Sequence, residues 1–228
     1  MTRLRETFEI YRKPIIAGVV AVVVVVAAVI GVLAWRSEAD SQARVGLADA
    51  MAVERAQVAP ALAPGATTPP PPAPAGSFPN EKARNEAALA KFMAVATQYP
   101  SADAGITARY HAAALLTLLG RQSDALQRYQ EVIDRAGSSL YGEMARLGIA
   151  DVQVAAGQWD KAIATYKEMS ARKDGKLPVD GILMQLGRAY GAAGKPVDAK
   201  QTFKRIADEF PQSPYAADAK REMDAIKG

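Results

Sequence analysis

Residues 186–211 read LGRAYGAAGKPVDAKQTFKRIADEFP, and the spacing of small and aromatic residues within them decides the fold. Ala199, Phe203 and Ile206 stand at positions i, i+4 and i+7, so they share one face of a helix. Gly194 lies five residues before Ala199, where a tight turn needs a residue that tolerates positive φ. The stretch therefore predicts two amphipathic helices that are joined by a short glycine turn.

The same pattern occurs four times, with a period of 37 residues. Each copy has an alanine, an aromatic residue four positions later and an apolar residue three positions after that: Ala88, Phe92 and Val95; Ala125, Tyr129 and Val132; Ala162, Tyr166 and Met169; Ala199, Phe203 and Ile206. Glycines precede the last three copies at the same step: Gly120, Gly157 and Gly194. A fixed period of this length is typical of a helical solenoid, in which stacked repeats bury a continuous core.

An amphipathic stretch precedes each of these glycines, over residues 106–119, 143–156 and 180–193. Seven positions before each glycine stands a small residue that lets one helix approach another closely: Ala113, Ala150 and Gly187. Each repeat is therefore expected to be a helix, a glycine turn and a second helix. Residues 213–226 begin a further first helix that has no partner after it, so we expect a capping helix there.

These residues resemble the tetratricopeptide repeat (TPR) family. In the last repeat the match comprises Leu186, Gly187, Tyr190, Gly194, Ala199, Phe203, Ile206 and Pro211. The middle repeat retains Gly157, Trp159, Ala162 and Tyr166, and the earlier one retains Gly120, Ala125 and Tyr129. The family's repeat has about 34 residues, so we expect the extra residues in the turns between repeats, at 136–142 and 172–178. The resemblance covers residues 80–228. It implies an all-α solenoid of helical hairpins rather than an ordinary helical bundle with accidental periodicity.

Residues 15–35 form an apolar segment without a charged residue. Its 21 residues are long enough to cross the ~30 Å hydrocarbon core of a bilayer as one transmembrane helix. Basic residues are concentrated before it, so the positive-inside rule predicts a cytoplasmic tail over 1–14 and a C-terminal domain outside the cytoplasm. A cleaved signal peptide is the alternative. Its apolar core would have only about 7–15 residues, so we favour a membrane anchor.

Two different segments follow the apolar one. Residues 36–59 contain no proline and are expected to form a juxtamembrane helix, which can continue the membrane helix. Residues 60–79 contain eight of the chain's 14 prolines, so this Pro/Ala-rich linker cannot be helical and is expected to be extended polyproline II. We interpret it as a spacer rather than as a ligand of an SH3-type domain.

The copy of the pattern at Ala88 lacks a first helix immediately before it. The natural partner is the stretch 38–58 across the Pro-rich linker, with Leu47 and Met51 on the face that packs near Phe92. The alternative is a free stalk helix and a repeat domain that begins at residue 80. We favour the split repeat, because an unpaired second helix would leave Phe92 exposed.

The residue inventory argues against an enzyme. The chain has no cysteine, and its only histidine is His111, which excludes Cys-ligated metals, His clusters and Cys/His pairs. The sequence contains no GxxxxGK[ST] phosphate loop. We therefore predict no catalytic residue, no metal and no cofactor, and we interpret His111 as structural. Asp124, Asp160 and Asp198 follow the turns, where a carboxylate stabilises the N-terminus of the next helix.

The net charge of +4 does not point to nucleic acid. Four basic and two acidic residues precede the apolar segment, and 24 basic and 22 acidic residues follow it, so each part contributes +2. A difference of two charges over the whole C-terminal part is too small for a basic binding face.

The family resemblance implies a concave surface, lined by the first helices, that holds a segment of another protein. It places these residues on that surface: Tyr110, Thr117, Met144, Asp151, Met184 and Arg188. Adjoining positions are Ala114, Leu147, Val154 and Gly191, of which Leu147 and Val154 can instead pack between repeats. A lining of Met and Tyr with one acid and one base suits adaptable protein binding. The sequence does not indicate whether the chain forms an oligomer.

The layout also resembles the single-pass inner-membrane ancillary subunit of the bacterial Sec translocon. The resemblance lies in the stretch 34–50 after the membrane segment and in 141–162, with its Ala145-x-x-Gly148-x-Ala150 run. It implies a bacterial inner-membrane protein that serves protein export or envelope quality control, with translocon subunits or a membrane-anchored periplasmic chaperone as partners. Residues 210–216 also resemble repeats of outer-membrane assembly and Tol-Pal proteins, which leaves a structural tether or scaffold as the alternative.

Overall fold

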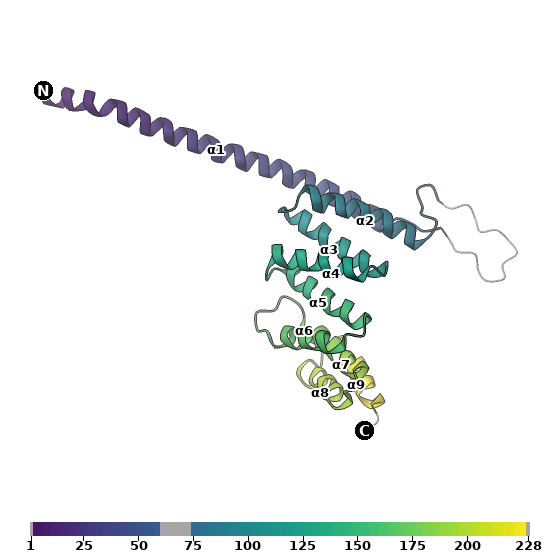
Figure 1. Cartoon of the computed structure of the whole chain (residues 1–228). Helices are drawn as coiled ribbons and strands as arrows, with labels where there is room; N and C mark the ends of the chain where they lie inside the picture. The colour runs from purple at the N-terminus through teal and green to yellow at the C-terminus, as the bar shows by residue number, and fades with distance from the viewer. Residues whose placement is uncertain (1, 60–73, 227–228) are drawn as a thin grey trace.

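Nine helices are the regular elements of the computed structural model, which describes residues 2–59 and 74–226. Their bounds are α1 (Thr2–Glu54), α2 (Glu81–Gln98), α3 (Asp103–Leu118), α4 (Gln122–Ala136), α5 (Leu140–Ala155), α6 (Trp159–Ala171), α7 (Val179–Ala192), α8 (Pro196–Glu209) and α9 (Ala216–Ala225). Helices α2 to α9 follow one another in a row of hairpins beside the C-terminal end of α1 (Figure 1). The predicted all-α solenoid, with a long apolar N-terminal helix, is confirmed.

Glycine turns join the two helices of each hairpin, as predicted. Gly120, Gly157 and Gly194 have φ of +73°, +70° and +70°, a conformation that favours glycine. The turn at Gly120 satisfies the end of α3: the Gly120 N–H donates to the Thr117 carbonyl (3.0 Å) and the Arg121 N–H to the Leu116 carbonyl (2.9 Å). The other two turns repeat this Schellman hydrogen-bond pattern. One local motif therefore sets the geometry of three hairpins.

The first helices begin three residues earlier than predicted in α3 and α5, at Asp103 and Leu140. The turn between α4 and α5 is accordingly only 137–139 rather than 136–142. Gly142 makes this tight entry possible, because a side chain there would collide with the Gly137 carbonyl oxygen. The turn over 172–178 has the predicted bounds, whereas the capping helix α9 is shorter than 213–226.

The repeat signature forms the core. The signature alanines and aromatics are buried in two adjoining clusters, one from α1 to α5 and one from α5 to α9: Ala88, Phe92, Ala125, Tyr129, Ala162, Tyr166, Ala199 and Phe203. Gly187 is required for close approach, because a Cβ there would lie 2.7 Å from Cζ of Phe203. Pro211 is exposed in the connection from α8 to α9.

Helix α1 belongs to both the apolar segment and the repeat domain. It runs without interruption through the expected membrane and juxtamembrane segments. Ala43 and Ala50 on its C-terminal part are fully buried, and Leu47 and Met51 pack in the same cluster as Phe92. The C-terminal part of α1 is therefore paired with α2 and is not a free stalk. The helix ends at Glu54 instead of residue 59.

The expected spacer role of the Pro-rich linker is wrong, because its two ends lie together. The Ala59 N–H donates to the Phe78 carbonyl (2.8 Å), and the Phe78 N–H donates to the Gln57 carbonyl (2.9 Å). The bridge between Val58 and Phe78 closes the loop where α1 meets α2. Since α1 and α2 pack directly on each other, the linker cannot set the distance between the apolar segment and the domain. The expected polyproline II conformation concerns mainly residues 60–73, which lie outside the described residues.

Candidate protein-binding surface

The residues predicted to line the binding surface come from α3, α5 and α7. Thr117 and Met144 are partly exposed, Tyr110 is half-buried, and Asp151 and Arg188 are exposed. Met184 is a wrong prediction, because it is 1% exposed and no partner can reach it. It lies in the core cluster that also includes Ala219 and Met223 of α9. The equivalent residues of the earlier repeats, Tyr110 and Leu147, are only partly buried.

Tyr110 is the centre of an aromatic cluster that connects three helices. Its ring centroid lies 5.8 Å from that of Tyr129 in α4 and 5.7 Å from that of Tyr141 in α5. Tilted arrangements at this spacing are favourable for aromatic rings. Burial raises the pKa of Tyr110, and it raises the pKa of Tyr129 to about 12. Tyr129 is 4% exposed, so only the partly exposed Tyr110 and Tyr141 can contribute to the candidate surface.

His111 packs against the first hairpin. Its ring stacks on Phe92, with centroids 4.9 Å apart and planes 12° apart. Its Nδ1 lies 3.4 Å from Oε2 of Glu54, the last residue of α1. This histidine therefore ties α3 to both helices of the first hairpin. The described residues hold no group of three His, Asp or Glu side chains placed for a metal ion.

Asp151 is joined to the core of its own hairpin. Tyr166 Oη donates a hydrogen bond to Asp151 Oδ1 at 2.6 Å. Asp151 is exposed as a residue, but the protein around its carboxyl group displaces part of the solvent, and this desolvation raises the pKa of the carboxyl. The hydrogen bond from Tyr166 offsets part of that rise. The pKa of Tyr166 is raised as well, first by burial and then by the same hydrogen bond. The hydrogen bond thus fixes the position of the Asp151 carboxylate on the candidate surface.

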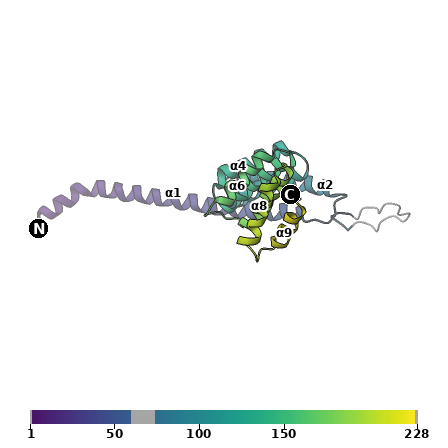
Figure 2. The same ribbon diagram turned by 90° about the horizontal axis from the view of Figure 1, so that it is seen from below.

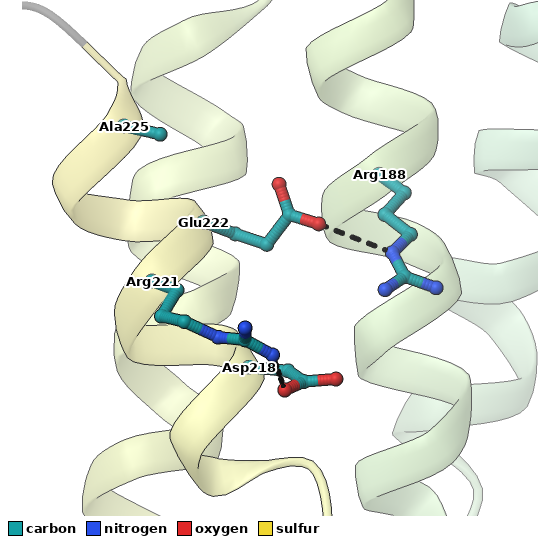
Figure 3. Close-up of a pocket in the computed structure, with 5 residues that line it drawn as sticks. All are labelled: Arg188, Asp218, Arg221, Glu222 and Ala225. Atoms are coloured by element: carbon teal, nitrogen blue, oxygen red, sulfur yellow. Dashed lines mark hydrogen bonds and ion pairs between the residues drawn. The ribbon is translucent and has the colours of Figure 1, made fainter.

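Arg188 is engaged by the capping helix. Its Nε lies 3.4 Å from Oε1 of Glu222, while Arg221 pairs with Asp218 on the same helix (Figure 3). These four side chains, with Ala225, line a pocket of about 350 Å³ between α7 and α9. The pocket contains two cations and two anions, so it has no excess charge for either kind of ligand. The sequence placed Arg188 on the surface but gave no sign of its partner 34 residues away.

Ion pairs tie neighbouring helices together, one between two hairpins and one within the α5–α6 hairpin. Lys195 Nζ lies 2.7 Å from Oδ1 of Asp160, so the α7–α8 turn is tied to the start of α6. Glu143 is 2% exposed and its carboxylate meets Arg172 Nη1 at 2.6 Å. The predicted acids do lie in the first turns of their helices: Asp124 in α4, Asp160 in α6 and Asp198 in α8.

Comparison with known proteins agrees with this geometry. A family model described as tetratricopeptide repeat-like domain matches residues 8–177, and a second one, described as tetratricopeptide repeat, matches residues 182–213. The chain belongs to the tetratricopeptide repeat-like family. The first match spans the apolar part of α1 and the Pro-rich linker as well as the first hairpins. No curated protein matches the sequence.

Two solved TPR structures have the same fold at low sequence identity. One consists of the nearly identical TPR-like repeats of a kinesin light chain homologue from Podosopora anserina. It is 14% identical with a TM-score of 0.53, and the match covers 61% of this chain and 76% of that one. The other is a TPR protein from Parabacteroides merdae, 15% identical with a TM-score of 0.51, and the match covers 63% of this chain and 54% of that one. TPR proteins are generally non-enzymatic scaffolds that bind other proteins, and this chain has their fold.

The Asp151 carboxyl gives a testable pH dependence. The folded chain binds this proton more tightly than the unfolded chain, because its folded pKa is raised. The free energy of unfolding should therefore decline as the pH rises above the ordinary carboxyl range. Asp151→Asn keeps an oxygen that accepts from Tyr166 but does not titrate. We expect it to raise stability at neutral pH by less than about 1 kcal/mol, since the carboxylate still meets solvent, and to flatten the pH profile.

Urea unfolding at several pH values, followed by circular dichroism, measures this effect. Asp49→Asn, on the exposed side of α1, is the control and should leave the profile unchanged. An Asp151→Asn protein that is less stable than the parent chain at neutral pH would contradict the assigned direction of the shift.

Proposed function

We propose that this TPR protein is anchored in a membrane by α1 and binds other proteins through the surface of α3, α5 and α7. The observation that carries the proposal is the long, exposed apolar part of α1, which continues without a break into the repeat domain. Its apolar part has an 18-residue window of mean hydropathy 2.4, none of which is buried against the described chain. The valines from Val20 to Val29 are each at least half exposed. A helix of this length and composition is stable in lipid, whereas exposure of so many apolar side chains to water is costly.

The orientation follows from charge. Basic residues precede the apolar segment, which favours a cytoplasmic N-terminus and an extracytoplasmic repeat domain. The proposed location is the bacterial inner membrane, with the domain in the periplasm. We further propose a role as an accessory factor in protein export or envelope protein quality control. The support for this role is the resemblance of the layout to the Sec ancillary subunit. Translocon subunits or a membrane-anchored periplasmic chaperone are the expected partners.

Structural scaffolding of envelope complexes is the other function that the layout admits. A tether needs the Pro-rich linker to separate the domain from the membrane. The two ends of the linker are paired, and the C-terminal part of α1 packs in one core cluster with α2, so the linker provides no such separation. We therefore place the export and quality-control role first.

Photo-crosslinking in intact cells tests the binding surface. A photoreactive residue at Thr117 or Gly191 lies on the surface, and Gln130 in α4 and Gln201 in α8 are exposed control positions on second helices. We expect crosslinks to export or chaperone proteins from Thr117 and Gly191 and a much weaker yield from the two controls. Equal yields from all four positions would contradict the assignment of the surface. Recovery of only wall or outer-membrane components would favour scaffolding.

A reporter fused after Gly228 checks the topology independently. Activity of a reporter that works only outside the cytoplasm is the expected result. Activity of a cytoplasmic reporter at the same position would overturn the orientation and move the partners into the cytosol.

A further inference from the structure

A cleft lies where α1 leaves its apolar segment. It has a volume of about 850 Å³ and separates the α1 stretch 35–42 from the turn between α2 and α3. From α1 it is lined by Trp35, Arg36, Glu38, Ala39, Asp40 and Gln42. From the turn it is lined by residues 98–102, which include Tyr99 and Ser101. Tyr99 also packs against the core, whereas the other lining residues belong neither to the core clusters nor to the candidate protein-binding surface.

The position of the cleft relative to the membrane follows from the continuity of α1. Trp35, 72% exposed, ends the apolar segment, where aromatic side chains sit at the level of lipid headgroups. Only residues 36–42 separate it from the fully buried Ala43, and they span about 10 Å at the helical rise of 1.5 Å per residue. The headgroup region beyond the hydrocarbon core is about 5–8 Å thick on each side. The α2–α3 turn, which shares the cleft with Trp35, must therefore reach into or next to this region.

The other turns between hairpins lie on the same side of the domain. Helix α2 runs back along α1, so its C-terminal end points toward the N-terminal, apolar part of α1 (Figure 1). In both views the apolar part of α1 extends beyond the remaining helices (Figures 1 and 2). The apolar part of α1 and the repeat domain have no flexible joint between them, because α1 is unbroken. One edge of the repeat domain consequently faces the surface from which α1 emerges.

The polar groups of the cleft fit a zwitterionic headgroup. Arg36 supplies a guanidinium, the group that recognises phosphate best. Among the ion pairs of the described residues none involves Arg36. Asp40 lies one helical turn after Arg36, on the same side of α1, and supplies a carboxylate, which matches a primary ammonium group. Glu38 points to another side of the helix and accepts a hydrogen bond from Gln42 Nε2 at 2.9 Å. Tyr99 and Ser101 add hydroxyl groups from the opposite wall.

We propose that this cleft binds the headgroup of a phosphatidylethanolamine-type lipid of the membrane that α1 spans. Arg36 holds the phosphate, and Asp40, one helical turn further along α1, holds the ammonium group. The bound lipid fills the space between α1 and the α2–α3 turn and so seats the repeat domain on the membrane surface. This inference rests on the proposed membrane anchoring. It adds a lipid ligand that protein binding by the repeats does not require.

Single-cysteine labelling tests the proposal cleanly, because the chain has no cysteine. Ser101→Cys in the α2–α3 turn and Ser123→Cys beside the α3–α4 turn are both exposed, and they lie at opposite ends of α3. Each full-length variant carries an environment-sensitive fluorophore and is reconstituted in phosphatidylethanolamine/phosphatidylglycerol vesicles with a headgroup-nitroxide lipid. We expect several-fold stronger quenching at position 101 than at 123. Arg36→Gln should reduce the quenching at 101 markedly, while Arg44→Gln, exposed on α1 outside the cleft, should not.

Three results would overturn the proposal. One is equal quenching at the two positions, which would show that the turn is no nearer to the membrane than the opposite edge. Another is strong quenching at position 101 that Arg36→Gln leaves unchanged. The third is the same quenching at 101 in vesicles of phosphatidylglycerol alone, which offer no ammonium group. An alkaline carbonate wash followed by vesicle flotation distinguishes failure of the proposed lipid site from failure of the proposed membrane anchor. A chain that leaves the vesicles contradicts the proposed anchoring, whereas a retained chain with an unquenched turn contradicts only the lipid site.

Discussion

Phe92→Ala is expected to lower the free energy of unfolding by about 3–5 kcal/mol and to release the end of α1 from the repeat domain. The side chain is 0% exposed and stacks on His111. It lies in the cluster that receives Ala50, Leu47 and Met51 from α1. Truncation would leave a cavity at the place where α1, α2 and α3 meet. No neighbouring side chain can fill this cavity without moving one of the three helices.

Chemical unfolding of the full chain in detergent, followed by circular dichroism, measures the stability change. Limited proteolysis in the loop after Glu54 measures the release of α1 and should become faster. Leu118→Ala is the control, because it removes an apolar side chain of similar size that is 73% exposed on the adjacent α3. We expect it to change stability by no more than about 0.5 kcal/mol. If both variants behaved alike, the packing of α1 against the repeats would not be part of the core.

Gly187→Ala and Gly191→Ala are expected to change stability in opposite directions, although both glycines lie in α7. A Cβ at Gly187 would lie 2.7 Å from Cζ of Phe203 and in conflict with two further ring atoms. Overpacking of this kind costs about 1–3 kcal/mol, which exceeds the about 1 kcal/mol that alanine gains over glycine inside a helix. Position 191 has no atom within 4 Å of such a Cβ, so only the gain in helix propensity remains.

Thermal unfolding of the two variants under identical conditions checks this pair. The melting temperature should fall for Gly187→Ala and rise for Gly191→Ala. A double variant, Gly187→Ala with Phe203→Leu, supplies the structural control, because a smaller residue opposite position 187 should relieve part of the conflict. A rise in stability for Gly187→Ala alone would show that α7 and α8 are further apart than the structure places them.

Much of the fold could be predicted from the sequence, because its determinants are local. The i, i+4, i+7 pattern of Ala199, Phe203 and Ile206 defines a helix face without reference to any distant residue. The positive φ of Gly194 is likewise a property of one residue in one turn. Repetition at 37 residues then extends these local features to the whole domain. The errors at the starts of α3 and α5 arose where a further glycine, Gly105 and Gly142 respectively, permits a tighter turn than spacing alone indicates, because a side chain there would collide with the carbonyl oxygen of Tyr99 or Gly137.

The candidate surface was less predictable. The exposure of Tyr110, Thr117 and Asp151 follows from their positions on first helices, which every repeat shares. Met184 has the same repeat position as Tyr110, yet it is buried in a core cluster, whereas Tyr110 is only half-buried. Arg188 meets Glu222 of α9, 34 residues away. A repeat position therefore does not fix how far a side chain is exposed, because that depends on the neighbours in the folded core.

The sequence by itself determined that this chain is an all-α TPR protein with one apolar helix long enough to span a membrane. Both features are encoded in short-range patterns of residue size and hydrophobicity. Only the tertiary structure decided that α1 is also part of the first hairpin, that the Pro-rich linker closes on itself at Val58 and Phe78, and that the α2–α3 turn lies beside Trp35. These are contacts between segments far apart in the chain. They depend on which surfaces pack together, and this is determined by the packing of the whole core rather than by any local pattern.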